Sequence, residues 1–317
     1  MDSESKFKIA VVGIGGVGGG GGGELAARFE NSANVKVFLA ARGANEKAIR
    51  ADGLRLVTDG GEQIVRPKLI STAEIGDADL LLLCTKEYDL EETVSVLKDF
   101  IGRQTIVLPL LNGVDGTDRI ARILPQNEIW RGCIYIVSRL IEPGVVQQSG
   151  DVCLIYFGDG KAKTKKSEFV EKVFQQAGID ARFAEDIVAK TWDKFIFISA
   201  VAAATSYLDA DFSELFAGAE NKKLLDELLA EIKRVAAARK INFSETAVRQ
   251  TLDKLNGMPR GATSSMRRDF SRGGKAELQS LVGYVVEQAR ELNVPTPVYE
   301  KVYGELTNRQ KLAAKGG

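Results

Sequence analysis

A glycine-rich segment directly after the first apolar run limits the fold more than any other feature of this chain. Residues Phe7–Val12 are typical of a buried strand, and residues 24–29 are typical of a helix. The segment between them begins with the spacing G-x-G-x-x-G, whose glycines permit a tight turn, a close backbone approach to a diphosphate and close helix–strand packing. A diphosphate would lie at the positive end of the helix dipole. The residues predicted to hold it are Gly13, Ile14, Gly15, Gly16, Val17 and Gly18.

The glycine run continues through residues 19–23, for which the sequence indicates no function. Each Gly inside a helix costs up to about 1 kcal/mol relative to Ala, so the first turns of this helix are expected to be soft. A flexible linker is the alternative interpretation of the whole segment. A linker would not normally lie between a buried strand and a helix.

Short apolar runs alternate with helical patterns in the first half of the chain, which is typical of a parallel, doubly wound sheet. After the first strand, strands are expected at 35–40, 80–84, 104–109, 129–137 and 152–157. Near residue 185 the pattern becomes helical, with helices expected at 188–208, 213–239, 245–255 (with Ser244 as N-cap), 276–292 and 298–312. The sequence therefore predicts an α/β chain in which a Rossmann-type doubly wound sheet (residues 1–184) precedes an all-α C-terminal domain (residues 185–317).

The composition excludes several classes of function. The 317 residues include no His, which excludes Ser-His-Asp and Cys-His nucleophile systems, HExxH zinc sites and His-dependent dehydrogenases. Acid–base chemistry must then come from Lys, Asp, Glu, Tyr or Cys, and no metal site is expected. Totals of 43 basic and 43 acidic residues provide no net field for nucleic acid or an acidic membrane.

The predicted location is the cytoplasm. The polar, acidic N-terminus does not have the pattern of a signal peptide. The longest uncharged apolar run, residues 195–207, is too short to span a bilayer. Three widely spaced cysteines without a CxxC pair indicate free thiols in a reducing compartment.

The residues at the end of the second expected strand bear on the choice of nucleotide. NAD-binding proteins of this type carry Asp or Glu there for the ribose hydroxyls, whereas residues 31–45 contain no acidic residue. Instead Ala41 leaves room for a 2′-phosphate, and the guanidinium of Arg42 can bind one. The pattern favours NADP. The alternative is that Arg42 is an ordinary surface charge.

Four further polar residues are candidates for the chemistry. Lys86 and Asn112 follow the third and fourth strands, where ligands bind in open α/β sheets; Asn before Gly is alternatively a turn signal. Lys194 precedes the apolar half of a helix, where desolvation favours release of its proton; a Lys that merely extends its charged end into water is the alternative. Glu277 lies beside the apolar stripe of its helix, or is a first-turn acid favoured by the helix dipole.

Together these residues resemble the ketopantoate reductases (2-dehydropantoate 2-reductases) over nearly the whole chain. The matching motifs are the glycine loop, Ala41-Arg42-Gly43, Thr85-Lys86, Asn112-Gly113, Glu142-Pro143-Gly144, Trp192-Asp193-Lys194, Ser264-Ser265-Met266 and Glu277. The family is NADPH-dependent and combines a Rossmann domain with a helical domain. The resemblance implies reduction of 2-dehydropantoate to pantoate, a precursor of coenzyme A, by a monomer or homodimer with a small 2-oxo acid as its substrate.

The resemblance also implies a role for each matched residue. Lys194 would donate the proton while NADPH transfers a hydride to C2 of the 2-oxo acid, and its ammonium would stabilise the carbonyl oxygen. Glu277 would be a carboxylate near cofactor and substrate. Ser265 would help to hold the substrate, Asn112 would contact both molecules, and Arg42, Lys86 and, more loosely, Ser138 would contact the cofactor.

The chain departs from the family pattern at two places. Better-known members carry Asn residues that contact the substrate where this chain has Ile198 and Ala202, and two aromatic residues where it has Gly20 and Gly21. The first departure leaves open a related reductase of another 2-oxo acid. A non-catalytic, NADP-binding sensor is a further alternative, although a sensor need not keep the catalytic set together.

Overall fold

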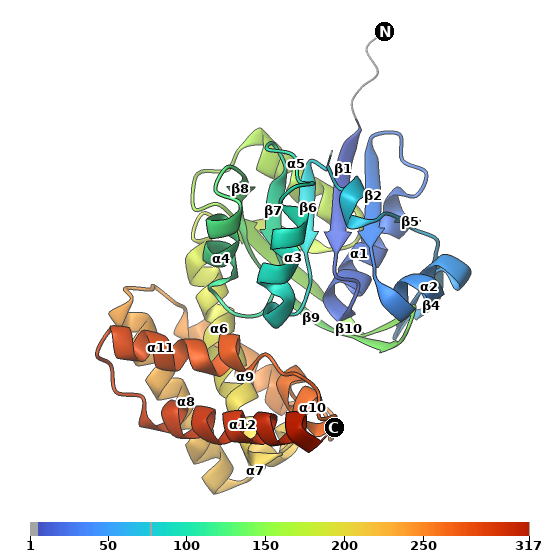
Figure 1. The fold of residues 1–317 in the computed structure, drawn as a ribbon. Coiled ribbons are helices and arrows are strands. Elements are labelled where there is room, and N and C mark those ends of the chain that lie inside the picture. Colours follow the sequence, from blue (N-terminus) through green and yellow to red (C-terminus); the bar gives the residue numbers. More distant parts are fainter. Residues whose placement is uncertain (1–5, 77, 317) are drawn as a thin grey trace. The chain divides into compact units, whose positions relative to one another are not determined.

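The computed structural model describes residues 6–76 and 78–316, and the chain divides into two compact units (Figure 1). The first unit comprises Met1–Leu111 and Asp115–Ile187, and the second comprises Asn112–Val114 and Val188–Gly317. The predicted fold class, a Rossmann-type doubly wound sheet followed by an all-α domain, is confirmed. Within the described residues, no helix is both long enough and apolar enough to cross a membrane.

A six-stranded sheet, in which every pairing is parallel, forms the centre of the first unit. Its order is β5-β2-β1-β6-β7-β8, so the chain moves outward in one direction from β1 and then crosses to the other side of β1. Ligands bind at such a switch point, outside the carboxyl ends of the strands. The strands are β1 (Phe7–Val12), β2 (Val35–Ala40), β5 (Lys68–Leu69), β6 (Leu80–Leu83), β7 (Ile106–Pro109) and β8 (Glu128–Ile129).

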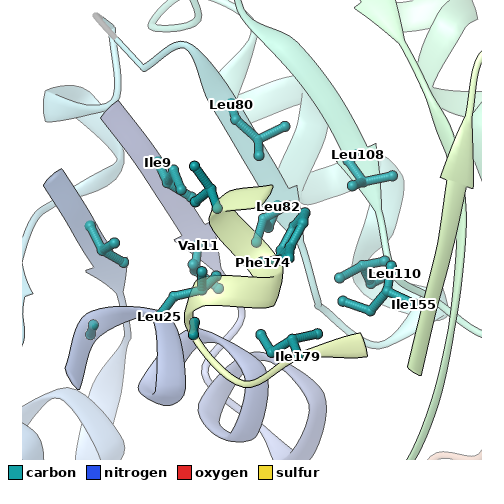
Figure 2. Packing of buried hydrophobic residues seen from close by; sticks show 14 of the residues in the cluster. Ile9, Val11, Leu25, Leu80, Leu82, Leu108, Leu110, Ile155, Phe174 and Ile179 are labelled. Carbon is teal, nitrogen blue, oxygen red and sulfur yellow. The ribbon is translucent and has the colours of Figure 1, made fainter. Parts of the chain in front are cut away.

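The side chains of these strands alternate between two apolar cores, because successive residues of a strand point to opposite faces. Ile9, Leu80 and Leu108 belong to the core on the α1 and α5 side, part of which Figure 2 shows. Ala10 and Leu81 belong to the opposite core, on the α3 and α4 side. Burial on both faces explains the continuous apolar runs of the sequence. The helices of this unit are α1 (Gly16–Phe29), α2 (Gly43–Asp52), α3 (Leu90–Leu97), α4 (Gly116–Ile123) and α5 (Lys165–Gln176).

A second sheet in the first unit is not indicated by the sequence pattern. It has the order β11-β10-β3-β4, and β9 pairs antiparallel with β10. Most of the strand expected at 129–137 and all of the strand expected at 152–157 form this β9–β10 hairpin instead of extending the parallel sheet. The hairpin turns through Gly144, whose φ of +80° favours glycine. The strands are β3 (Leu54–Thr58), β4 (Gly61–Val65), β9 (Arg131–Glu142), β10 (Val145–Gly158) and β11 (Asp180–Phe183).

The second unit consists of helices and loops throughout its described residues. The helix expected at 188–208 is α6 (Ile187–Leu208), and Ser244 is the N-cap of α9, as predicted. The helix expected at 213–239 is instead two helices, because the backbone is extended at Gly218. The helix expected at 276–292 begins with a π-helical turn, Gln279–Gly283. The others are α7 (Phe212–Ala217), α8 (Ala219–Ala238), α9 (Glu245–Asn256), α10 (Ser265–Ser271), α11 (Tyr284–Glu291) and α12 (Pro297–Gly316).

The glycine run forms the first turns of α1, where most of its members have no room for a side chain. A Cβ at Gly18 would lie 2.2 Å from the carbonyl oxygen of Gly13, and one at Gly20 would lie 3.1 Å from Oγ of Ser138. Gly21 is buried, yet a Cβ there would meet no atom within 4 Å. Among residues 18–23, Gly21 alone can take a methyl group without displacing a neighbour.

Gly21→Ala is expected to stabilise the protein by about 0.5–1 kcal/mol, because Ala loses less backbone entropy than Gly in a helix and the methyl group has space. Gly18→Ala is the matched control, and it is expected to destabilise the protein because its methyl group overlaps the Gly13 carbonyl. Denaturant unfolding of both variants measures the two effects. A free energy of unfolding in the Gly21 variant that equals or falls below that of the wild type would contradict this account.

Candidate active site

The glycine loop joins β1 to α1 in the first unit. Gly13 has a φ of +91°, and a Cβ there would lie 2.7 Å from the backbone nitrogen of Thr85. Gly15 is the N-cap of α1, and a Cβ on it would meet no atom within 4 Å. The first turn of α1 contains no acidic residue. The positive end of the helix is therefore suited to an anion.

Two side chains from outside this loop bind its carbonyl groups. Ser138 of β9 donates a hydrogen bond to the carbonyl oxygen of Gly16 at 2.9 Å. Asn45 of α2 donates to the carbonyl oxygen of Ile14 at 2.6 Å. Ser138 therefore lies beside the glycine loop. The resemblance predicts that Ser138 contacts the cofactor, which this loop is expected to bind. Sequence reasoning missed Asn45, which carries no signal beyond its place three residues after Arg42.

The structure pairs Arg42 with an acidic residue that is distant in sequence. Arg42 follows β2, its side chain is 78% exposed, and its guanidinium lies 2.9 Å from a carboxylate oxygen of Asp89. Asp89 ends a 3₁₀ turn (Glu87–Asp89) that follows β6. Residues 31–45 contain no acidic side chain, but the fold supplies one from another loop. Any anion that binds Arg42 must compete with this carboxylate or share the guanidinium with it.

The loop after β6 brings Lys86 and Thr85 to the carboxyl edge of the sheet. Lys86 is half-buried and is the N-cap of the 3₁₀ turn. The Oγ1 atom of Thr85 is buried and has no hydrogen-bond partner among the described residues. Burial raises the pKa of the preceding Cys84 thiol to about 12, so Cys84 is not a nucleophile at neutral pH. An unpartnered hydroxyl near an open helix N-terminus fits a ligand that is rich in phosphate and hydroxyl oxygens, as a dinucleotide is.

An ion-pair network with one buried member, Glu87, holds this loop to the beginning of α4. Glu87 is 4% exposed and pairs with Arg119, which also contacts Glu91 at 3.0 Å and Asp115 at 3.4 Å. Burial lowers the pKa of the Arg119 guanidinium. Sequence reasoning missed the network, because its members lie in separate segments without a motif. It links the loop that carries Lys86 to the segment directly after Asn112.

Three of the predicted site residues form one hydrogen-bonded chain in the second unit. Lys194 lies on α6 and is 8% exposed, and its Nζ donates to Oδ1 of Asn112 at 3.0 Å. Nδ2 of Asn112 donates to a carboxylate oxygen of Glu277 at 3.2 Å. An ammonium can only donate and a carboxylate can only accept, so the two neighbours determine which way the amide faces. The chain thus joins a buried cation and a buried anion through one neutral amide.

Glu277 reaches this position just before an irregular turn of its helix. The π-helical turn Gln279–Gly283 follows it, and such turns often occur at functional sites. Ser199 of α6 donates to the carbonyl oxygen of Leu281 inside the turn at 2.6 Å and lies 2.7 Å from the hydroxyl of Tyr299. Ser199 and Tyr299 are fully buried. The wide turn is therefore held from outside by the same helix that carries Lys194.

The remaining predicted residues lie on the helical unit. Ser265 is half-buried at the start of α10, and none of the hydrogen bonds seen among the described residues joins its hydroxyl to Lys194 or Glu277. Ile198 is half-buried one turn after Lys194, whereas Ala202 is 1% exposed. No three His, Cys, Asp or Glu side chains in the described parts of the chain gather in a way that could hold a metal ion.

Known proteins match this chain along most of its length. Family models described as ketopantoate reductase PanE/ApbA and as its C-terminal region match residues 9–162 and 186–310. A 2-dehydropantoate 2-reductase of Halobacterium salinarum is 29% identical over 255 residues, which are 79% of this chain and 82% of that protein. An uncharacterized oxidoreductase of Bacillus subtilis, YkpB, is 26% identical over 300 residues, which are 94% of this chain and 97% of that protein.

A solved structure with substantial identity agrees. The crystal structure of a 2-dehydropantoate 2-reductase from Porphyromonas gingivalis has a TM-score of 0.82 and 36% sequence identity, and it covers 96% of this chain and 100% of that one. Members of the family are oxidoreductases that bind a nicotinamide cofactor, which agrees with the dinucleotide fit of the glycine loop. This chain therefore belongs to the ketopantoate reductase (PanE/ApbA) family.

Proposed function

We propose that this chain is a cytoplasmic, NADPH-dependent reductase of a small 2-oxo acid, with 2-dehydropantoate as its substrate and pantoate as its product. The observation that carries the proposal is the Lys194–Asn112–Glu277 chain, in which a buried ammonium is available as a proton donor. Residues 1–184 are assigned to the cofactor, and residues 185–317 carry Lys194, Ser265 and Glu277.

In the proposed mechanism the glycine loop and the first turn of α1 would hold the cofactor, which when bound would supply a hydride for the carbonyl carbon of the substrate. Negative charge develops on the carbonyl oxygen, and the Lys194 ammonium stabilises that charge and donates a proton to the same oxygen. Asn112 accepts one hydrogen bond from Lys194 and thereby orients the ammonium. Glu277 holds the other end of the Asn112 amide, so the position of Lys194 depends on both residues.

One residue of α6 bears on the identity of the 2-oxo acid. Ile198 lies one turn after Lys194 on α6 and is apolar. A substrate with a hydroxyl group would be better bound by a side chain that can form hydrogen bonds at this position. A related reductase with a more apolar 2-oxo acid is therefore the second candidate. A panel of 2-oxo acids in the NADPH absorbance assay separates the two: the first requires the highest kcat/KM with 2-dehydropantoate, and the second requires it with an acid that lacks the hydroxyl.

The cofactor prediction concerns the Arg42–Asp89 pair. Arg42→Ala is expected to lower kcat/KM for NADPH about tenfold and to leave NADH nearly unaffected, because a charge-assisted contact to the 2′-phosphate is lost. Asp89→Asn is expected to raise the preference for NADPH by up to about fivefold, because an exposed ion pair that competes for the guanidinium contributes up to about 1 kcal/mol. Steady-state kinetics with both cofactors measures the ratio. Equal use of the two cofactors by the wild type would contradict the NADPH assignment.

The catalytic prediction concerns Lys194. Removal of a general acid typically costs about 10²–10⁴ in rate, so Lys194→Ala is expected to lower kcat by that order and to leave the affinity for NADPH nearly unchanged. Lys190→Ala is the matched control, because Lys190 lies one turn earlier on α6, is one-third exposed and lies 4.0 Å from Asp193. It is expected to have a mild effect. If the Lys190 variant is inactive and the Lys194 variant is active, the assignment of Lys194 as the proton donor is wrong. If neither variant has a lower kcat with any 2-oxo acid, the result would favour a non-catalytic NADP-binding sensor.

A third prediction tests the amide that joins the two charges. Asn112→Ala is expected to lower kcat/KM about 10- to 100-fold, because it removes hydrogen bonds to an ammonium and a carboxylate. Asn127→Ala is the control, because Asn127 also donates through its amide, to the carbonyl oxygens of Gly102 and Thr105. That variant is expected to lose stability and to keep kcat/KM. Equal kinetic losses in the two variants would show that Asn112 acts only through folding.

A further inference from the structure

The side chain of Asn45 joins the glycine loop to the second sheet through both ends of its amide. Nδ2 donates to the carbonyl oxygen of Ile14 at 2.6 Å, and Oδ1 accepts from the backbone N–H of Gly144 at 2.7 Å. A carbonyl can only accept and an N–H can only donate, so the orientation of the amide is unambiguous. Asn45 is half-buried and lies on α2, outside both the glycine loop and the second sheet.

The Ile14–Gly15 peptide is the part of the loop that has least restraint of its own. Helix α1 begins at Gly16, so the carbonyl of Ile14 lies outside the helical hydrogen-bond ladder. Gly15 has no side chain, and nothing lies within 4 Å of where its Cβ would be. Rotation of a peptide next to a glycine meets little steric resistance. The loop itself restrains the peptide through the bond from the Gly15 N–H to the Gly13 carbonyl oxygen, and the external contact to the Ile14 carbonyl is the second restraint on its direction.

The direction of this peptide matters for an anion. In a trans peptide the C=O and the following N–H point in opposite directions. The Ile14 carbonyl is held by Asn45, while the N–H of Gly15 bonds to the carbonyl oxygen of Gly13 at 3.0 Å. A flipped peptide would break both bonds and would turn the Ile14 carbonyl toward the carbonyl oxygen of Gly13. The two dipoles would repel each other, and the backbone that a diphosphate must approach would change its shape.

The other end of the Asn45 contact is firmly placed. Gly144 is the turn of the β9–β10 hairpin, its φ is +80°, and its carbonyl oxygen accepts from the N–H of Arg55 at 2.8 Å. The same hairpin carries Ser138, which binds the carbonyl oxygen of Gly16. The second sheet thus contacts Gly16 directly through Ser138 and is joined to Ile14 through Asn45.

We infer that Asn45 is a positioning residue for cofactor binding, which locks the Ile14–Gly15 peptide so that the loop accepts the diphosphate of a nicotinamide dinucleotide. The inference rests on the part of the proposed function that concerns the cofactor, and it is independent of the 2-oxo acid and of Lys194. It makes the affinity for the diphosphate depend on a side chain whose amide is bonded to the protein backbone at both ends.

The test compares the binding of NADPH, NADH and adenosine 2′-monophosphate, measured by calorimetry, in wild type and Asn45→Asp. The variant keeps an acceptor for the Gly144 N–H but places a carboxylate oxygen against the Ile14 carbonyl. We expect its dissociation constants for NADPH and NADH to rise about tenfold or more. Binding of adenosine 2′-monophosphate, which has no diphosphate, should change less than twofold.

Asn221→Asp is the matched control, because the half-buried Asn221 also donates through Nδ2 to a backbone carbonyl, that of Glu214, in the other unit. It should bind all three molecules like the wild type. Asn45→Ser, which loses both contacts without adding charge, gives the same comparison if circular dichroism shows that the Asp variant is unfolded.

Two results would overturn the inference. Wild-type affinity for both dinucleotides in the Asn45 variants would show that the loop holds its own conformation. Equal weakening of all three molecules would show a general structural role without a link to the diphosphate. If the wild type itself binds neither dinucleotide, the proposed function fails as well, so the two failures are distinguishable.

Discussion

The burial of the parallel sheet on both faces is the constraint on which the rest of this structure depends. Ile9 and Ala10 are neighbours in β1, and each is fully buried in a different core. A strand that is covered on both sides has no place for an unpaired polar side chain. In this unit, polar residues at the carboxyl edge of the sheet therefore lie in the loops that follow the strands. Arg42 and Lys86 do so after β2 and β6, and Gly13 follows β1.

The polar chain in the helical unit is a consequence of desolvation. Lys194 and Glu277 are both almost fully buried, and a buried charge without a partner is costly. Asn112 meets both requirements because an amide has an acceptor at one end and donors at the other. Its contact takes one of the three donor hydrogens of the ammonium. The neutral amide therefore provides a hydrogen-bond partner for the carboxylate and for the ammonium at the same time.

Local patterns in the sequence predict the elements whose cause is local. The apolar runs predict β1, β2, β6 and β7 of the parallel sheet but not the two-residue strand β5, and the Ser before residue 245 predicts the N-cap of α9. The split at Gly218 was missed because one extended residue can interrupt a continuous helical pattern. The β9–β10 hairpin was missed because its pairing depends on contacts between strands, which periodicity does not report. Asp89 and Arg119 were missed for the same reason: their partners lie in other segments.

The glycine loop shows how these non-local contacts complete a local motif. Glycines allow the backbone to come close to a diphosphate, but they also leave it with more conformational freedom than any other residue type. The G-x-G-x-x-G spacing allows the backbone to approach a diphosphate, but it cannot by itself make that backbone rigid. Asn45 and Ser138 restrain it through Ile14 and Gly16, from α2 and from a hairpin whose strands follow the loop by more than a hundred residues. The second sheet thus restrains the backbone of the glycine loop, directly through Ser138 and indirectly through Asn45, and these contacts limit the freedom that the glycines would otherwise have.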